Sequence, residues 1–306
     1  MTTSSVTSRP DNPVTGACLI VFAVFLMALQ DAVIKYASSD LTLWQLYVLR
    51  SLLALPVLAV IAGLKRTTPA VLASAAARWV TLRSCLLVLM YVSLYAAIPV
   101  LPLSTLAAGF YTGPLFIAIL SAVLIGEPVS TRGWLAVATG FSGVLLIIRP
   151  GTDEFSLLVL LPVLSGLFYA LAAILTRDRC QHDTPVALAI SLNLVLLITG
   201  AAVSVVLFAW QPSGTVLPPF LSGPWAAMTL REWGLVMVLA VLIVGIGVGL
   251  AAAYQAARPV IVATFDYSYL IFSTMFGFLL FAETPDLATV TGMGLIAGAG
   301  LIVVRS

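Results

Sequence analysis

Two stretches of the sequence, 156 residues apart, follow one pattern: GEPVSTRGWLAVATGFSGVLLIIRP at residues 126–150 and AETPDLATVTGMGLIAGAGLIVVRS at residues 282–306. In this alignment Glu127 falls on Glu283. Each stretch closes one half of the chain with an acidic turn, a glycine-rich apolar segment and an arginine, after an aromatic-rich apolar segment. The match predicts that the chain consists of two related halves.

The composition predicts that most of the chain lies in lipid. Of the 306 residues, 61% are hydrophobic and 8% are charged, which is far from the composition of a soluble domain. A membrane-spanning helix needs about 20 mainly apolar residues. Segments of that kind lie near residues 14–36, 42–63, 79–98, 103–125, 132–148, 155–176, 185–209, 233–256, 259–281 and 287–304. We therefore expect an all-α integral membrane protein of ten transmembrane helices, preceded by a cytoplasmic tail at residues 1–13.

The two halves, residues 14–150 and 155–306, would each contain five of these helices. Because five is an odd number, the second half would enter the membrane from the opposite side and be inverted relative to the first. Inverted repeats recur in secondary transporters, in which the substrate site lies between the two copies. A duplicated membrane scaffold without transport is the alternative.

The basic residues predict the orientation, since Lys and Arg gather in cytoplasmic loops. With a cytoplasmic amino terminus, that side holds Arg9, Lys65, Arg66, Arg78, Arg132, Arg177, Arg179, Arg258 and Arg305, and the other side holds Lys35, Arg149 and Arg231. Both termini are therefore expected in the cytoplasm.

Several motifs resemble a known repeat. The run Ile125-Gly126-Glu127-Pro128, then Trp134, then residues 140–151 resemble the EamA-type repeat of the drug/metabolite transporter superfamily. The stretch at residues 31–36, followed by Arg50, is similar to the opening of that repeat. The second copy departs from it by Ala282 in place of the glycine and Ser306 in place of the closing proline.

The resemblance implies a secondary transporter of the bacterial inner membrane that needs no cofactor. Within the superfamily the chain is similar to the YddG-type bacterial exporters, which implies export of aromatic and other neutral amino acids by alternating access. Export or import of another small metabolite or drug is the alternative. The partners expected are the lipid bilayer and a small-molecule substrate, with the protein as a monomer or homodimer.

Charged residues inside spans cost about 2.5–3.5 kcal/mol on insertion scales, so they are functional candidates. At 1.5 Å per residue, Arg50 lies about 12 Å and Asp31 about 9 Å below the same membrane face. The two side chains are expected to pair, either as a structural or gating element or at the substrate. Lys35, one turn shallower, is expected to extend to the interface.

A second acid, Asp266, stands between Phe265 and Tyr267 in the ninth segment. It suits the ammonium group of an amino acid or an exchanged proton, and bonding to Arg258 or to a neighbouring helix is the structural alternative. In this superfamily aromatic residues lie on the cavity-lining helices, as Tyr269 also does here, and Gln30 adds an amide. The substrate-binding candidates are Gln30, Tyr91, Tyr95, Phe110, Tyr111, Phe168, Tyr169, Tyr254, Asp266 and Tyr267.

Gating candidates lie at helix ends and at one predicted bend. Gly113-Pro114 is expected to bend the fourth helix. Glu127 and Glu283 end equivalent helices and are expected to cap the helix that follows each of them, with a role in a gate as the alternative. The glycine pairs at 109/113, 245/249 and 294/298 are spaced for close helix contact.

Other functions lack support in the sequence. No Walker-type motif is present, His182 is the only histidine, and no cluster of acids, cysteines or serines indicates an enzyme. Cys18, Cys85 and Cys180 are too far apart in sequence to suggest a metal site or a disulfide. Basic residues are scattered, which argues against nucleic acid. Since Asp31 and Asp266 are the only mid-helix acids, a neutral or zwitterionic substrate is favoured over a strong cation.

Overall fold

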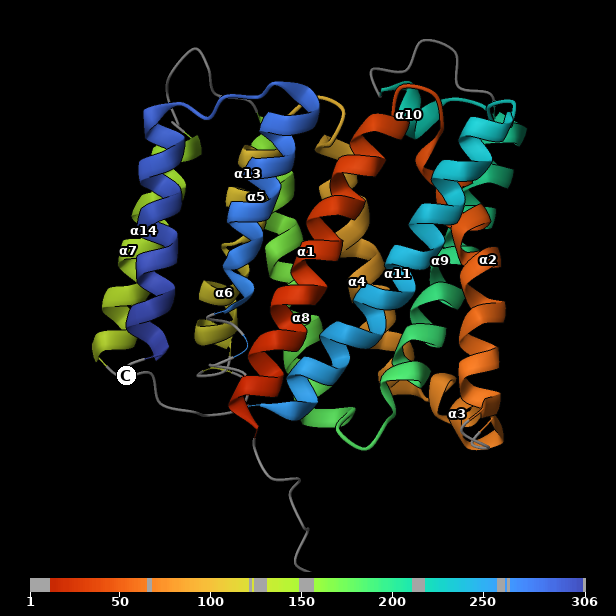
Figure 1. Cartoon of the computed structure of the whole chain (residues 1–306), viewed down its shortest axis with the longest axis horizontal. Helices are drawn as coiled ribbons and strands as arrows, with labels where there is room; N and C mark the ends of the chain where they lie inside the picture. The colour runs from red at the N-terminus through yellow and green to blue at the C-terminus, as the bar shows by residue number, and fades with distance from the viewer. Residues whose placement is uncertain are drawn as a thin grey trace, which may run out of the picture.

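The computed structural model describes residues 12–64, 68–120, 123, 131–148, 157–210, 218–257, 262 and 265–304, and these residues contain helices and no strand (Figure 1). The helices are α1 (Pro13–Ala37), α2 (Leu43–Leu64), α3 (Thr68–Ala75), α4 (Arg78–Ala97), α5 (Leu103–Phe110), α6 (Gly113–Leu120), α7 (Thr131–Ile148), the 3₁₀ helix η2 (Leu157–Val159), α8 (Leu160–Arg179), α9 (Pro185–Trp210), α10 (Pro219–Ser222), α11 (Leu230–Ala256), α13 (Ser268–Phe281) and α14 (Leu287–Val304). The expected all-helical class is confirmed.

Six of these helices are long and apolar enough to cross a membrane: Val14–Ala37, Leu43–Gly63, Arg78–Ala97, Leu157–Thr176, Pro185–Trp210 and Leu230–Tyr254. Shorter apolar helices occupy the remaining predicted positions, at Leu103–Ile117, Ala138–Ile147, Ser268–Phe281 and Leu287–Ala299. The prediction of a multi-span membrane protein is confirmed. The exact number of ten membrane-spanning helices stays a prediction.

The long helices run side by side between two faces of the bundle. Helix α1 begins and α14 ends at the lower face of Figure 1, which we call the N-terminal face. The turn from α1 to α2 and the short helix α10 lie at the other end, which we call the opposite face. Asn12 starts α1 by accepting a hydrogen bond from the backbone N–H of Thr15 at 3.1 Å, and Pro13 occupies the first turn.

The most extensive helix contacts are α1 with α11, α4 with α8, α2 with α9, and α7 with α14. Glycine lets α7 and α14 approach closely: a Cβ added to Gly143 would lie 2.6 Å from the carbonyl oxygen of Gly292. The pair Gly294 and Gly298 was also predicted to make such a contact, but among the described residues no neighbouring atom lies within 4 Å of a Cβ added at either position. That expectation is wrong, because Gly292 faces α7 and the later glycines point away from it.

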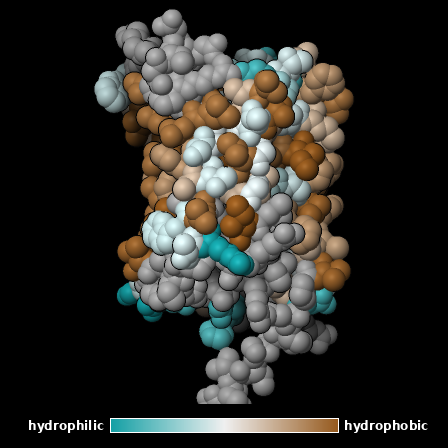
Figure 2. Space-filling view, turned by 90° about the vertical axis from the view of Figure 1, so that its left-hand side faces the viewer, coloured by the Kyte–Doolittle hydropathy of each residue, from teal (hydrophilic) through white to brown (hydrophobic). Residues whose placement is uncertain are grey.

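The outer surface of the bundle is apolar, as lipid requires. Figure 2 shows brown apolar side chains along the sides of one face and among pale residues in its middle, with teal hydrophilic residues toward its upper and lower ends. Trp134, Leu135 and Phe141 on α7 and Leu287 and Val290 on α14 are exposed. Large exposed apolar areas mark a membrane or partner surface, so this face supports burial in a bilayer.

Two of the predicted spans are interrupted. The fourth is split into α5, which ends at Phe110, and α6, which begins at Gly113. The ninth segment contains a turn at Tyr267, after which α13 begins at Ser268. The 156-residue offset places Tyr111 on Tyr267, so both interruptions occur at equivalent positions. The fourth span thus breaks at Tyr111 and Thr112, immediately before the predicted bend at Gly113-Pro114.

Candidate functional site

The first buried acid of the bundle core is Asp31 on α1. Tyr95 of α4 donates its hydroxyl proton to Asp31 Oδ1 at 3.0 Å, and the hydroxyl of Tyr269 on α13 donates to Asp31 Oδ2. The amide nitrogen of Gln30 donates to the Tyr95 hydroxyl at 2.9 Å. Asp31 is 3% exposed, so two tyrosine hydroxyls take the place of water around its carboxylate.

The second buried acid, Asp266, lies at the turn that precedes α13. Tyr111, at the interruption between α5 and α6, donates to the backbone carbonyl oxygen of Asp266 at 2.7 Å and to its Oδ1 at 3.2 Å. The hydroxyl of Tyr169 on α8 donates to Asp266 Oδ2 at 3.5 Å and lies 3.0 Å from the hydroxyl of Tyr254 on α11. The two helix interruptions are thus joined through one tyrosine.

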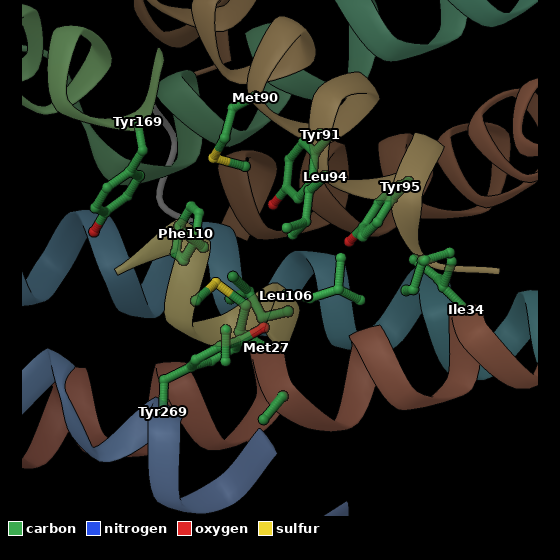
Figure 3. Packing of buried hydrophobic residues seen from close by; sticks show 14 of the residues in the cluster. Met27, Ile34, Met90, Tyr91, Leu94, Tyr95, Leu106, Phe110, Tyr169 and Tyr269 are labelled. Atoms are coloured by element: carbon green, nitrogen blue, oxygen red, sulfur yellow. The ribbon is translucent and has the colours of Figure 1, made fainter. Parts of the chain in front are cut away.

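Aromatic rings connect the two acids. Tyr111, the hydrogen-bond donor to Asp266, stacks on Tyr269, the donor to Asp31. Their ring centroids are 5.2 Å apart and the interplanar angle is 24°. Phe110 packs against Tyr169 at 5.2 Å and against Tyr269 at 6.1 Å, and Figure 3 shows these rings converging from different helices. Tyr267 packs against Tyr111 at 5.5 Å.

We call the two buried acids and the tyrosine and phenylalanine rings around them the tyrosine cage. Of the ten predicted substrate-binding residues, nine lie in it: Gln30, Tyr91, Tyr95, Phe110, Tyr111, Tyr169, Tyr254, Asp266 and Tyr267. Phe168 is partly buried and packs at the edge of the core. The side chain next to it on α8, Tyr169, faces the cage instead. Whether these residues bind substrate stays a prediction.

The cage can hold either a proton or a cationic group. A carboxylate only accepts hydrogen bonds, and its two oxygens offer about four acceptor positions. The tyrosine hydroxyls occupy part of that capacity at Asp31 and at Asp266, which leaves lone pairs for an ammonium group or for a proton. Intramembrane acids of this kind mark substrate and proton pathways.

Arg50 on α2 is fully buried but does not pair with Asp31 as expected. Its guanidinium lies over the rings of Tyr47 and Tyr91, 5.1 and 5.6 Å from their centroids. Within the described part of the chain, its three nitrogens have no hydrogen-bond partner. Instead, the hydroxyls of Tyr95 and Tyr269 donate to the two oxygens of Asp31.

Tyr47 was not predicted from the sequence as a site residue, although its spacing offered a signal. Tyr47 precedes Arg50 by three residues, and residues three apart on a helix are neighbours on one face. Its ring is fully buried and packs edge-on against Trp44 at 5.9 Å. An arginine within a span with an aromatic residue one turn away therefore indicates a cation–π contact.

A cavity of about 20 Å³ lies between α4, α8 and α11, toward the N-terminal face. Its lining includes Tyr169 and Tyr254, which separate it from Asp266. Arg83 also lines it and donates from Nε to the hydroxyl of Thr176 at 2.7 Å. A space of this size can hold about one water molecule. Tyr169 lines it and also donates to Asp266, so it lies one side chain away from that acid.

The opposite face is closed by an ion pair that the sequence did not predict. Lys35 Nζ lies 2.5 Å from Glu283 Oε1 and donates to the carbonyl oxygen of Leu101 at 2.7 Å. Glu283 Oε2 accepts from the backbone N–H of Leu103, the first residue of α5, at 2.8 Å. Lys35 therefore ends in an ion pair at this face. Glu283 caps α5 of the first half rather than α14, whose first turn is capped by Asp286. We call this group the Lys35–Glu283 clasp.

Two further predictions concern Glu127 and metals. Glu127 lies outside the described residues. Among the residues that the structure describes, no group of three or more His, Cys, Asp or Glu side chains is placed to hold a metal ion. Cys18, Cys85 and Cys180 are free thiols.

Comparison with known families identifies the first half of the chain. Residues 14–149 match the EamA-like transporter family. This range coincides with the first predicted five-helix half, so the expected EamA-type domain is confirmed there.

Relatives of known function cover nearly the whole chain. The riboflavin transporter of Vibrio cholerae is 28% identical over 90% of this chain and 87% of its own length. The pseudopaline exporter CntI of Pseudomonas aeruginosa strain UCBPP-PA14 is 26% identical over 95% of this chain and 96% of its own length. Both relatives are bacterial transporters, and neither bears the name of an amino-acid exporter.

A solved crystal structure shares the fold. It covers 94% of this chain and 95% of its own, with a TM-score of 0.62 and 18% sequence identity. At this identity the likeness concerns the arrangement of the helices alone.

Proposed function

From the EamA-like first half, we propose that the chain is a transporter of the bacterial inner membrane that carries a small metabolite by alternating access. The observation that carries this proposal is the pair of buried acids, Asp31 and Asp266, joined by tyrosine rings where two interrupted helices meet. Interrupted helices at the centre of a bundle are the usual sites for substrates and coupling ions in secondary transporters. We place both termini in the cytoplasm, on the basis of the lysine and arginine distribution.

The helix contacts support two inverted halves. The five spans of the first half are α1, α2, α4, α5 with α6, and α7. Their equivalents in the second half are, in the same order, α8, α9, α11, α13 and α14. Exchanging the halves then converts the α1–α11 contact into the α8–α4 contact, and it leaves α2–α9 and α7–α14 unchanged. These are the four most extensive contacts in the bundle. A pseudo-two-fold axis accounts for all of them.

The two faces of the bundle differ in the way that alternating access requires. The Lys35–Glu283 clasp closes the opposite face. On the other side, the small cavity beside Arg83 leads toward Tyr169 and Asp266. We infer that this conformation is closed to the opposite face. Breaking the clasp would begin the change to the other state.

The tyrosine cage suits a solute with a flat or apolar part and polar groups. The names of the relatives, a riboflavin transporter and a pseudopaline exporter, favour a metabolite of this kind. Export of aromatic and other neutral amino acids is the second candidate, which Asp31 and Asp266 favour because an ammonium group would satisfy either carboxylate.

Uptake into liposomes tests the proposal. Labelled riboflavin, phenylalanine, methionine and threonine would be offered to vesicles that hold the purified protein, with and without an imposed pH gradient. Saturable uptake of at least one solute is expected, and it should fall in Asp266→Asn but not in Asp178→Asn, which alters an exposed acid paired with Arg179. If neither these solutes nor a wider panel of metabolites shows protein-dependent flux, the scaffold alternative replaces transport.

A further inference from the structure

Arg50 is the largest fully buried side chain in the described residues. It lies on α2 within an apolar span, and its guanidinium touches the faces of Tyr47 and Tyr91. Its three nitrogens have no acceptor among the described residues. A guanidinium carries five N–H donors and stays charged, so this arrangement leaves all five donors unused.

Such a side chain is costly where it lies. Charges buried away from water are normally paired or hydrogen-bonded, because desolvation of an ion is expensive. Two aromatic faces compensate only part of that cost. Arg83 shows the usual solution within the same bundle: it is also buried, but its Nε donates to Thr176. Arg50 therefore has a binding capacity that the fold itself does not use.

Other unused polar atoms lie on the same helix. The hydroxyls of Tyr47 and Ser51, three residues before and one residue after Arg50, are buried and have no hydrogen-bond partner among the described residues. On α1, Gln30 Oε1 is also buried and has no hydrogen-bond partner among the described residues. The side chain of Gln30 lies beside Tyr91. Of these residues, Tyr47 contacts the Arg50 guanidinium through its ring, and its hydroxyl can donate to an anion. The oxygen of Gln30 is an acceptor and can serve a donor of the solute.

The site is connected to the first buried acid. Tyr91 stacks on Tyr95 with ring centroids 5.4 Å apart, and Tyr95 donates to Asp31. Arg50 and Asp31 are thus linked through two stacked rings without touching. A positive and a negative side chain that lie near each other without forming an ion pair match a solute that carries both signs of charge.

We propose that Arg50 binds a carboxylate group of the transported solute, with Asp31 available to the cationic end of the same molecule. The inference rests on the proposed transport function and adds a substrate class to it. A planar guanidinium binds a carboxylate through two parallel hydrogen bonds. One carboxylate balances the single charge of Arg50, whereas a phosphate would leave a second negative charge uncompensated close to Asp31.

Thermal unfolding of the purified full-length protein in detergent tests this binding without any flux measurement. The probes are sodium benzoate, its uncharged analogue benzamide, and phenyl phosphate. Benzoate at a concentration well above its dissociation constant is expected to raise the unfolding midpoint by about 3 °C or more. Benzamide should give no comparable shift, and phenyl phosphate should give a smaller one.

Variants locate the effect at Arg50. The benzoate shift should disappear in Arg50→Met and persist in Arg83→Met, which removes the other buried arginine. Since the guanidinium is unpaired, Arg50→Met should unfold at or above the wild-type midpoint when no probe is present. Arg50→Lys keeps the charge without the planar fork and should retain less than half of the shift.

Several results would overturn the inference. These are equal shifts from benzoate and benzamide, an undiminished benzoate shift in Arg50→Met or Arg50→Lys, or a lower midpoint of Arg50→Met in the absence of probe. A phenyl phosphate shift as large as that of benzoate would overturn the choice of a carboxylate. Benzoate binding at Arg50 without flux of any solute would instead refute transport and leave the anion site standing.

Discussion

Replacing Lys35 by methionine is expected to open the opposite face of the bundle. Methionine keeps most of the length of the side chain but removes the ammonium group that Glu283 and the carbonyl oxygen of Leu101 share. The ammonium also lies 5.4 Å from the ring centroid of Phe281. Every one of these contacts joins α1 to a segment at the opposite face that would move if this face opened.

The size of the effect follows from the burial of the pair. The side chains of Lys35 and Glu283 are 14% and 18% exposed. Removing one partner of a buried ion pair costs about 3–5 kcal/mol, and partial exposure reduces this to about 2–4 kcal/mol. If the contacts exist only in the closed state, the ratio of open to closed molecules rises roughly 30- to 1000-fold, at 1.4 kcal/mol per factor of ten.

Labelling of an introduced cysteine would report the opening. Ile98 is fully buried at the end of α4 near the opposite face. In a background of Cys18→Ala, Cys85→Ala and Cys180→Ala, the Ile98→Cys thiol should react with a maleimide much faster when Lys35→Met is added. Purified protein in nanodiscs exposes both faces to the reagent, so the result does not depend on orientation.

Two outcomes would refute this reasoning. The first is an unchanged labelling rate in Lys35→Met. The second comes from a double-mutant cycle: if the effects of Lys35→Met and Glu283→Gln on labelling simply add, the two side chains are not coupled in the closed state. Arg231→Met serves as the matched control, because its ion pair with Asp40 at the same face is largely exposed and should change labelling little.

Three further predictions concern other parts of the bundle. Asp266→Asn should abolish flux driven by a pH gradient, because the amide cannot take up the transported proton, and unchanged pH dependence would remove Asp266 from coupling. Gly143→Ala should lower stability by about 1–3 kcal/mol, since its Cβ would lie 2.6 Å from a backbone oxygen of α14, whereas Gly294→Ala should be neutral or slightly stabilising in a melting assay. Burial and then the charge of Asp183 raise the pKa of the Cys180 thiol to about 11. Its alkylation rate should therefore still rise with pH at about pH 10, and a plateau near the ordinary thiol pKa of about 8.5 would contradict this.

Much of the helix pattern followed from the sequence, because apolar length and proline or glycine boundaries are local signals. The predicted segment at 185–209 and helix α9 agree within one residue, and the predicted segment at 287–304 matches α14. The interruptions were predicted less well. At Gly113 the turn had a local signal, whereas at Tyr267 no glycine or proline marks the end of the helix. There, Tyr267 packs against Tyr111 from the other half of the chain, which is a contact that no local sequence signal reveals.

The candidate site was predictable in its residue types and not in its pairings. Asp31, Arg50 and Asp266 were all identified as charges in apolar helices. Their partners were not, because a tyrosine hydroxyl competes with a charged side chain for a carboxylate, and the outcome depends on distances between helices. The clasp illustrates the same limit: Lys35 and Glu283 are 248 positions apart, and only the packing of α13 beside α1 brings them together.

The two interruptions carry different residues at equivalent positions, Phe110 in one and Asp266 in the other. In a dimer of identical subunits related by symmetry, both positions would bear the same side chain, so two acids or none would meet at the centre. Joining two copies in one polypeptide removes that restriction. One copy can then carry a carboxylate at a position where the other keeps an aromatic ring, as Asp266 and Phe110 do here.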